Sequence, residues 1–355
     1  MSSKIKIYFI GRKQGIGHRK WRLSHLENRR KDEPQGLIDA SRKIEQIRFI
    51  SRANVIWVRI RPEFTTDVEV NKIKERLKKE REEKIIINDI DSFYNYDSKN
   101  ITFQLWKKAG LECPNYISIS PRKLEKDQSR IVTLIQEFIS IHDKIFLRTN
   151  NETAAKGIFV LDSNCTQKDI LDKLLFLKNR CLSFKSNRMG TNILSVEFIK
   201  PENKSGFIDL YRAHILFGKI ISYYVVTSKL DVFHNKDMCM DDLERFITLN
   251  QEIPNIIERF KEQILLGARS LGCNIGAIEF FIRNGKPIFL EFNPMWGGQA
   301  SKTGFGSDEV QGLLSKQKSN LVKKIPNIYS FLDYRNYYQN LYEKIYDNVS
   351  RTLTD

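Results

Sequence analysis

One hairpin pattern near the end of the chain constrains the fold more than any other stretch of the sequence. Residues 276–294 read GAIEFFIRNGKPIFLEFNP, two apolar runs on either side of an Asn-Gly pair. An Asn-Gly pair between apolar runs is a strong short-range signal for a β-hairpin. Such a ribbon should lie in a core, yet Glu279, Glu291 and Asn293 interrupt it. The sequence therefore predicts a buried hairpin that carries a polar site.

The register of this hairpin decides which side chains share a face. A two-residue turn would place Glu279 opposite Leu290, and Glu279 and Glu291 would then lie on opposite faces. One added residue, such as a type I turn with Gly285 in a bulge, reverses that parity. The three polar side chains, including Asn293, would then share one face.

Two carboxylates and an amide oxygen on one face would make a poor core. Unpaired acids held close together are costly unless a cation lies between them. Hard oxygen ligands of this kind suit Mg²⁺ or Mn²⁺, which keep some waters and bridge substrate phosphates. The alternative is a solvent-facing side on which the acids pair with Lys or Arg. The hairpin by itself leaves both interpretations open.

The first third of the chain alternates strand and helix patterns. Strands are predicted at 5–10, 55–60 and 84–88, with helices at about 37–50 and 68–83 between them. This β-α-β-α-β order implies a parallel sheet with helices on its faces.

Paired strands follow in the rest of the chain. They are predicted at 116–119, 145–149, 157–161, 193–199, 208–217 and 219–226, with helices at 98–109, 167–179 and 255–271. The tail is polar from Ser307 and becomes helical and tyrosine-rich at 329–349. The predicted fold class is α/β (α+β).

Composition excludes several classes of protein. At 355 residues, the chain can bury a core divided into about two or three subdomains. No apolar run reaches the roughly 20 residues of a membrane helix, and the N-terminus has no apolar signal core. The five cysteines are scattered without metal-site spacing, so free thiols and a cytoplasmic location are expected. The net charge of +16 would attract polyanions such as nucleotides, although biased codon usage could also produce it.

The hairpin resembles the last core hairpin of the ATP-grasp family. In that family an acid on the first strand and Glu-x-Asn on the second hold magnesium ions between the phosphates of the nucleotide. Glu279, Glu291 and Asn293 match this pattern in residue type. The resemblance implies that these residues bind Mg²⁺ (or Mn²⁺) together with ATP.

Two further segments resemble the phosphate-binding parts of the family, in the right order along the chain. YDSKNITFQLWKKAG (96–110) is similar to the segment in which a basic residue touches phosphate, and Lys99 occupies that position. IFLRTNNETAAKGIF (145–159) resembles the strand, small-residue loop and strand that folds over the phosphates. The resemblance implies phosphate contacts from Arg148 and Lys156.

A third segment resembles the hinge between the two subdomains of the family. In ILSVEFIKP (193–201), the acid at Glu197 and the backbone of Phe198 and Ile199 would meet the adenine edge. In the strand that follows, Arg212 resembles a residue that reaches the transferred phosphate or acyl phosphate. An arginine that simply pairs across the sheet is the alternative.

Weaker candidates accompany these segments. His214 shares a face with Arg212 but is also explained as a packed histidine, and Asn235 resembles a site-lining Asn. Residues 11–31 are rich in Arg and Lys but lack the glycine spacing of a nucleotide-binding fingerprint. Arg12, Lys13, His18 and Arg19 in this stretch form either an anion site or a solvated basic loop.

Two departures from the family pattern qualify the resemblance. The loop TNNETAAKG has a single glycine where the family usually has several, which predicts a stiffer lid or a different closure. After Glu-x-Asn, the sequence 294–298 lacks the arginine used by biotin carboxylases, which argues against bicarbonate chemistry. The sequence 294–298 is more similar to the glycine-containing loops of peptide-type ligases.

The resemblance implies an N-terminal parallel-sheet domain followed by two α+β subdomains that sandwich the nucleotide. The expected boundaries are 1–92 for the N-terminal α/β domain, 93–196 for the linker and small lid subdomain (lid about 143–196), 197–305 for the C-terminal core with the metal site, and 306–355 for a helical tail.

The function implied by the resemblance is an ATP-dependent, ADP-forming carboxylate-amine (or carboxylate-thiol) ligase that works through an acyl phosphate. Its expected partners are a small acid, such as a sugar acid or an amino acid, and an amine. A small-molecule kinase and a non-catalytic nucleotide-binding protein are the alternatives. No membrane or nucleic-acid partner is expected, because no aromatic-basic interleaving marks a base-stacking platform. The tyrosine-rich tail leaves a homodimer open.

Overall fold

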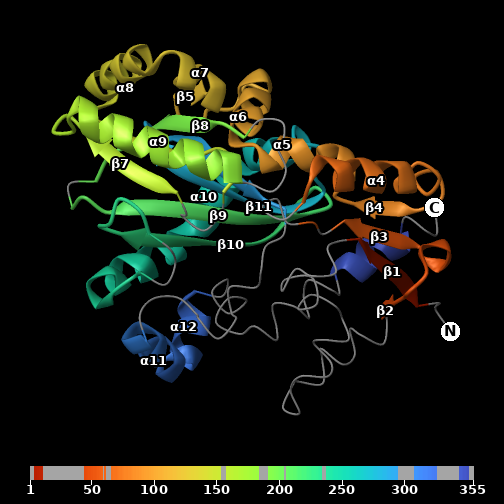
Figure 1. Cartoon of the computed structure of the whole chain (residues 1–355). Helices are drawn as coiled ribbons and strands as arrows, with labels where there is room; N and C mark the ends of the chain where they lie inside the picture. The colour runs from red at the N-terminus through yellow and green to blue at the C-terminus, as the bar shows by residue number, and fades with distance from the viewer. Residues whose placement is uncertain are drawn as a thin grey trace.

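The computed structural model places three sheets in the part of the chain that it describes (Figure 1). The described residues are 4–10, 44–58, 60, 65–152, 157–183, 191–203, 205–233, 237–294, 308–325 and 344–351. Each sheet has four strands. Within these residues, no helix combines the length and apolar character that crossing a bilayer requires.

The N-terminal sheet is parallel, as expected, with strand order β2-β1-β3-β4. Its elements are β1 (Ile5–Ile10), β2 (Ile44–Gln46), β3 (Val55–Val58), β4 (Ile85–Ile87) and helix α4 (Asp67–Leu77). Helix α4 begins with a capping box, in which Thr66 and Glu69 satisfy each other's backbone N–H groups.

The helix predicted at 37–50 is wrong over its described part. Residues 44–46 form β2, and Ile44 pairs with Ile5 in a parallel ladder. The spacing of Ile44, Ile47 and Ile50 suits a helix, but the open edge of β1 offers unpaired backbone groups that a strand satisfies.

A second sheet, fully antiparallel, has the order β5-β8-β6-β7. Its elements are β5 (Tyr116–Ile119), β6 (Lys144–Thr149), β7 (Ile158–Asp162), β8 (Ile193–Glu197) and the helices α7 (Pro121–Lys126), α8 (Gln128–His142) and α9 (Gln167–Ser183). Along β6, Ile145 and Leu147 pack in a core with α8 and α9, while Phe146 and Arg148 face a cavity. We call this sheet the upper wall.

Helices α7 and α8 were not predicted, although the sequence carries their start signals. Ser120 caps α7, which has Pro121 in its first turn, and Asp127 caps α8. A Ser-Pro start and an Asp cap are recognised helix N-termini.

The third sheet, also antiparallel, has the order β10-β9-β11-β12. Its elements are β9 (Ile208–Leu216), β10 (Lys219–Ser228), β11 (Ile275–Arg283), β12 (Lys286–Asn293) and helix α10 (Leu243–Arg269). Helix α6 (Lys99–Lys108) contacts β12, but the N–H of its first residue, Lys99, donates to the Asn150 carbonyl after β6, so we count the start of α6 with the upper wall. Gly267 lets α10 approach closely, because a Cβ there would lie 2.4 Å from Ile278 Cδ1. We call this sheet the lower wall.

Helix α10 begins earlier than predicted. The sequence places its start after Pro254, but the helix runs from Leu243 with Pro254 inside it. The apolar face continues through this point, since Leu249, Ile253 and Ile257 are all buried. Packing of that face outweighs the hydrogen bond that the proline removes.

An asparagine pair joins the N-terminal sheet to the lower wall. Asn88 is buried and adopts a φ of 51° just after β4. Its side-chain oxygen accepts from the N–H groups of Asn274 (3.1 Å) and Ile275 (3.0 Å), and its amide donates to the Pro294 carbonyl (3.2 Å). Both ends of the β11–β12 hairpin are therefore tied to one residue of another sheet.

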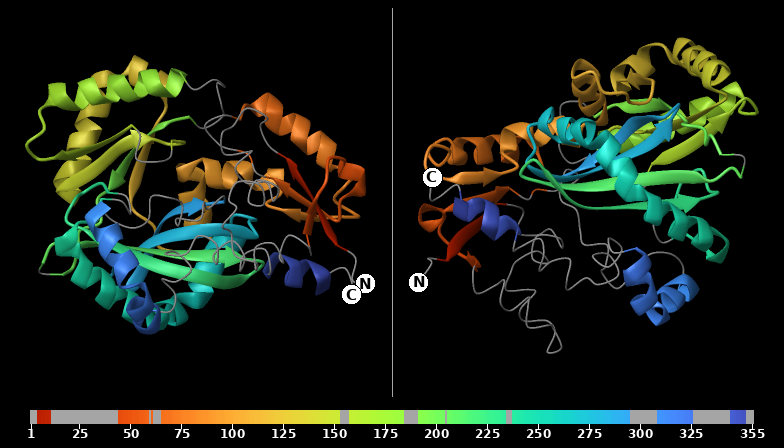
Figure 2. Two further views of the ribbon diagram at one scale, coloured as in Figure 1. Left: turned by 90° about the horizontal axis from the view of Figure 1, so that it is seen from below. Right: turned by 180° about the vertical axis from the view of Figure 1, so that it is seen from behind.

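The described parts of the tail pack against the body of the chain. Helices α11 (Asp308–Lys316) and α12 (Lys318–Lys324) precede a short helix at 344–351. Figure 2 shows this last helix beside the N-terminal sheet. Its buried residues Ile345 and Val349 belong to the same apolar cluster as Ile5 and Trp57.

Candidate nucleotide site

A cavity of about 320 Å³ lies between the upper and the lower wall. The side chains that line it come from β6, β7 and β8 above, from all four strands below, from α6 at one end, and from the segments next to these elements. Most of the lining residues are apolar: Phe103, Pro114, Phe146, Ile158, Val196, Ile199, Leu210, Val226, Val232, Phe233, Phe281 and Leu290. Five charged lining residues lie within reach of one another and form a charged region: Lys99, Arg148, Arg212, Glu279 and Glu291. Glu197 and Asp231 also line the cavity but pair with cations outside this group.

The hairpin reaches the predicted one-face arrangement by a different route. The turn itself is the two-residue form, with positive φ at Asn284 and Gly285. The added residue is Leu290 in the middle of β12, where the register shifts. The predicted parity is therefore confirmed, and the predicted position of the bulge is wrong.

The reason for this position lies on the other face of the hairpin. Phe280, Phe289 and Phe292 are buried there in one core cluster with α10 and α6. An Asn-Gly turn fixes the register at one end, while the aromatic side chains must all reach the core. One extra residue between Phe289 and Phe292 lets both requirements be met, and it turns Glu291 toward the cavity.

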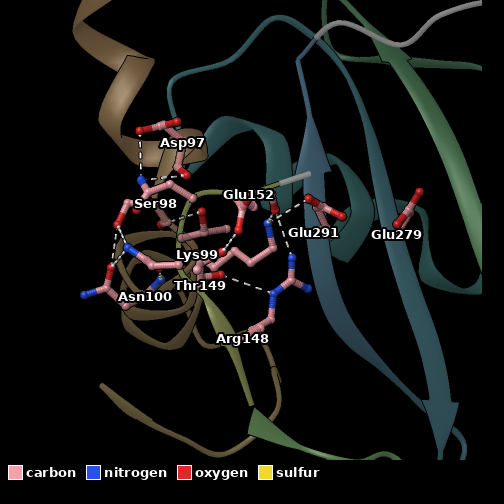
Figure 3. Close-up of polar contacts among 12 residues, drawn as sticks. Asp97, Ser98, Lys99, Asn100, Arg148, Thr149, Glu152, Glu279 and Glu291 are labelled. Atoms are coloured by element: carbon pink, nitrogen blue, oxygen red, sulfur yellow. Dashed lines mark hydrogen bonds and ion pairs between the residues drawn. The ribbon is translucent and has the colours of Figure 1, made fainter. Parts of the chain in front are cut away.

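Four side chains then form one row across the lower wall. Tyr224 pairs with Arg212, Arg212 with Glu279, and Glu279 with Glu291. All of them line the cavity, and Figure 3 shows the two acids on neighbouring strands. We call them the charged row. In the next row, Asn293 stands opposite Ala277.

Each acid of the charged row has a cationic partner. Arg212 Nη1 donates to Glu279 Oε1 at 2.6 Å, and Lys99 Nζ donates to Glu291 Oε1 at 2.9 Å. The acids thus pair with Arg and Lys, as one interpretation of the hairpin required, but the pairs line the cavity. Arg212 pairs across the sheet, as one of its predicted alternatives required, and it also faces the cavity. Its contact with a transferred phosphate stays a prediction.

The two acids differ in their pKa. Burial raises the pKa of Glu279, with Arg212 acting against it and Glu291 adding to it. Burial also raises the pKa of Glu291, but the nearby positive charges of Lys99 and Arg148 outweigh it, so the pKa of Glu291 is lowered. The charged form of Glu291 is thus favoured, while a further cation near Glu279 would lower its pKa and favour its charged form.

The upper wall contributes two cations that converge on one carbonyl (Figure 3). Lys99 Nζ lies 3.3 Å from the Glu152 carbonyl oxygen, and Arg148 Nη2 lies 3.0 Å from the same atom. Burial lowers the pKa of Lys99 and of Arg148, with Glu291 acting in the opposite direction on both. These cations are close enough to the charged row to serve one ligand.

Asparagines that the sequence analysis passed over hold this part of the wall. Asn150 is fully buried, and its side chain accepts from the Asn100 N–H (2.9 Å) and donates to Ser98 Oγ (2.6 Å). Asn151 donates to Asp97 Oδ2 at 2.9 Å. The consecutive asparagines after β6 were the available signal, because Asn side chains readily bond nearby backbone.

The hinge residues lie at the apolar end of the cavity. The Glu197 carboxylate accepts from the backbone (3.0 Å) and side-chain N–H (3.1 Å) groups of Asn115 and pairs with Arg283. The Phe198 N–H donates to the Lys144 carbonyl. Glu197 and Ile199 line the cavity. The Glu197 carboxylate and the Phe198 N–H therefore have partners within the protein, and the contact of Glu197, Phe198 and Ile199 with an adenine edge stays a prediction.

The remaining candidates are of two kinds. Lys156, Asn235 and the basic stretch 11–31 lie outside the described residues. His214 is buried, its Nδ1 lies 2.8 Å from Ser222 Oγ, and burial together with Arg212 holds its pKa well below the usual value. It is a neutral, packed histidine.

The residues present fit a divalent cation. Within the described chain, no group of three or more His, Cys, Asp or Glu side chains could hold a metal ion. The hairpin offers two carboxylates and the Asn293 carboxamide, an oxygen set that Mg²⁺ accepts when ligand phosphates and water complete it. The observation that favours a cation there is geometric: Glu279 stands directly opposite Glu291, and both line the cavity with Asn293.

Comparison by sequence finds no relatives. No profile of a known protein family matches the chain, and no curated protein matches it either.

Comparison by structure finds ligases. The D-alanine–D-alanine ligase from Bacillus anthracis, complexed with ATP, is similar over 94% of this chain and 99% of that chain, with a TM-score of 0.50 and 11% identity. The D-alanine–D-alanine ligase from Coxiella burnetii matches over 82% and 85%, with a TM-score of 0.50 and 10% identity. The ATP-grasp ligase PsnB complexed with minimal precursor matches over 83% of this chain and 92% of that chain, with a TM-score of 0.47 and 12% identity. At this identity the likeness shows the fold, and the chain has the ATP-grasp fold.

Proposed function

We propose that this chain is an ATP-dependent carboxylate-amine ligase that forms an amide through an acyl phosphate and releases ADP and phosphate. The observation that carries the proposal is the charged row of the lower wall facing Lys99 and Arg148 of the upper wall across one cavity. A triphosphate needs cations on several sides, and this arrangement supplies them.

The cavity suggests how ATP would lie. Its apolar end, between Phe146 and Leu210, suits a planar base, with the Ile199 backbone at the base edge. The triphosphate would extend toward α6. A lysine ammonium has one more N–H than the two acceptors of Lys99 use, so Lys99 can also donate to a phosphate oxygen.

Glu279, Glu291 and Asn293 would hold Mg²⁺ (or Mn²⁺) against the phosphates. The ion would supply neutralising charge where the phosphoryl group is transferred. Arg212, tied to Glu279, would stabilise the same group from the strand beside it. Lys156 remains a further proposed phosphate contact, from a segment outside the described residues.

The chemistry then needs no side-chain nucleophile. A carboxylate oxygen of the acid would attack the γ-phosphorus, forming an O–P bond while the bond to the bridging oxygen breaks and ADP leaves. The amine nitrogen would attack the carbonyl carbon of the acyl phosphate, forming the C–N bond as phosphate departs. The amine's extra proton passes to solvent. The protein's contribution is to orient the reactants, neutralise charge and exclude water.

The proposal is tested by ADP release against a panel of small acids and amines, sugar acids and amino acids included. ADP release that requires both an acid and an amine supports a ligase. Release with an alcohol or phosphate acceptor alone would reject the ligase and indicate a kinase. Calorimetry that detects no magnesium-dependent ATP binding would reject both.

A further inference from the structure

Glu152 is an acid in a part of the upper wall where the proposed function requires positive charge. It is an acid, 7% exposed, at the point where the two proposed phosphate-binding cations meet. Its carbonyl oxygen accepts hydrogen bonds from both Lys99 and Arg148. A carboxylate this close could pair with either cation directly, which would cancel the charge that a triphosphate needs.

Arg180 on α9 holds that carboxylate in another direction. Arg180 Nε donates to Glu152 Oε2 at 2.9 Å, and Arg180 Nη2 donates to Oε1. Thr149 Oγ1 donates to Oε2 at 2.8 Å. A guanidinium that engages both carboxylate oxygens is a strong and directional contact. The acid is thus bound on both oxygens by groups that take no part in the cavity lining.

The single glycine of the loop leaves room for this contact. Gly157 has a φ of 60°, and a Cβ built on it would lie 2.6 Å from Glu152 Oε2 and 3.0 Å from Arg180 Nε. Any other residue there would push into the ion pair. The positive φ and the nearby Glu152–Arg180 pair therefore both favour glycine at this position.

We propose that Arg180 is a positioning residue for nucleotide binding, which sequesters the Glu152 carboxylate so that Lys99 and Arg148 stay available for phosphate. The inference rests on the proposed function. It differs from a purely structural role, because the Glu152 negative charge becomes harmful once Arg180 is gone. Removing that charge should then restore binding.

The test measures the dissociation constant of Mg²⁺-ATP by calorimetry in four variants. Arg180→Met should weaken binding by about tenfold or more, since an unpaired buried carboxylate then competes for the cations. Glu152→Gln in the Arg180→Met background should recover most of the loss. The glutamine side chain can still accept the hydrogen bond from Thr149 Oγ1 but carries no negative charge, and the backbone carbonyl that contacts Lys99 and Arg148 is unchanged.

Glu152→Gln by itself should bind Mg²⁺-ATP at least as tightly as the wild type, and this variant decides the matter if Arg180→Met does not fold. The matched control is Lys178→Met on the same helix. Lys178 forms an ion pair with Glu125 at 2.8 Å, outside the cavity lining, and its loss should leave binding unchanged.

The inference is overturned if the double variant binds as weakly as Arg180→Met, if Glu152→Gln alone weakens binding tenfold, or if Arg180→Met binds like Lys178→Met. A wild-type protein that does not bind Mg²⁺-ATP would instead reject the proposed function. The two failures are therefore distinguishable in one series of measurements.

Discussion

The two walls of the cavity position their charged side chains by different physical means. On the lower wall, Tyr224, Arg212, Glu279 and Glu291 are aligned by strand pairing alone, one residue per strand. On the upper wall, Lys99 lies at the start of α6 and Arg148 near the end of β6, and polar side chains such as Asn150 hold the start of α6 in place.

This difference predicts that substitutions in the two walls affect folding and binding differently. A ladder keeps its register when one side chain changes, because backbone hydrogen bonds and the aromatic core on the other face hold it. A side-chain network loses several contacts with one substitution. We therefore expect lower-wall substitutions to change chemistry with little effect on folding, and upper-wall substitutions to change binding and stability together.

The largest effect is expected from Glu291→Gln on the lower wall. The variant loses a metal ligand and the partner of Lys99, and metal-ion charge stabilisation is worth several kcal/mol, so ADP release should fall on the order of 10³-fold. Circular dichroism and the unfolding midpoint should stay near the wild type. Near-normal turnover would refute the metal site.

A matched control for this variant is Glu112→Gln. Glu112 pairs with Lys286 at the exposed end of the same strand, away from the cavity lining. Its loss should leave ADP release unchanged, since an exposed ion pair contributes at most about 1 kcal/mol to stability.

The second largest effect is expected from Arg212→Met in the same row. An electrostatic contact to the transferred group typically contributes about 10²-fold or more, so kcat should fall by this factor while ATP binding changes little. Arg245→Met is the control, because Arg245 pairs with Asp209 and does not line the cavity. A loss of ATP affinity without a loss of kcat would assign Arg212 to binding only.

On the upper wall, Asn150→Ala should affect stability and binding at once. It leaves the Asn100 N–H without its acceptor and removes the donor to Ser98 Oγ, at a cost of about 1–3 kcal/mol in unfolding free energy. The start of α6 should shift, and ATP affinity should fall with it. Urea unfolding and calorimetry measure the two effects.

The comparison variant is Asn250→Ala. Asn250 is also buried and bonds the backbone of Val225, but on the side of the lower wall away from the cavity. It should cost similar stability and leave ATP affinity intact. Equal losses of affinity in both variants would contradict the contrast between the walls.

The smallest effect concerns His214, beside the charged row. Its folded pKa lies below its usual value of 6.5, so the unfolded chain binds a proton first as the pH falls. Stability from this group is present above pH 6.5 and should decline below it, by at most about 1.4 kcal/mol per pH unit. Urea unfolding at pH 7.5 and about pH 5 would show a smaller decline in His214→Asn. An equal decline would show that His214 takes no part.

The prediction of strands from the sequence succeeded where alternation was strong. Strand 116–119 and the hairpin around Asn284 were placed closely, because apolar alternation and turn residues are local signals. The helix at 37–50 failed because the pairing of Ile44 with β1 is a contact between distant segments. The start of α10 was predicted too late because Pro254 usually ends or begins a helix, whereas here packing of the buried face keeps the residues before it helical.

Candidate site residues could be chosen from the sequence, but several of their contacts could not. Motif order pointed to Lys99, Arg148 and the three hairpin residues. Nothing in the local sequence pairs Glu152 with Arg180, which lies on a helix that follows the next strand. The engagement of Glu197 by Asn115 and Arg283 is likewise a contact between three separate segments.

The sequence by itself determined the acids of the charged row, the Asn-Gly turn and the strands of the two antiparallel sheets, because each is written in short-range pattern. Only the tertiary structure decided where the extra residue enters the hairpin. The turn and the aromatic core on the far face require different registers, and Leu290 reconciles them. That bulge, set by packing rather than by any local signal, turns Glu279 and Glu291 to the same side of the sheet.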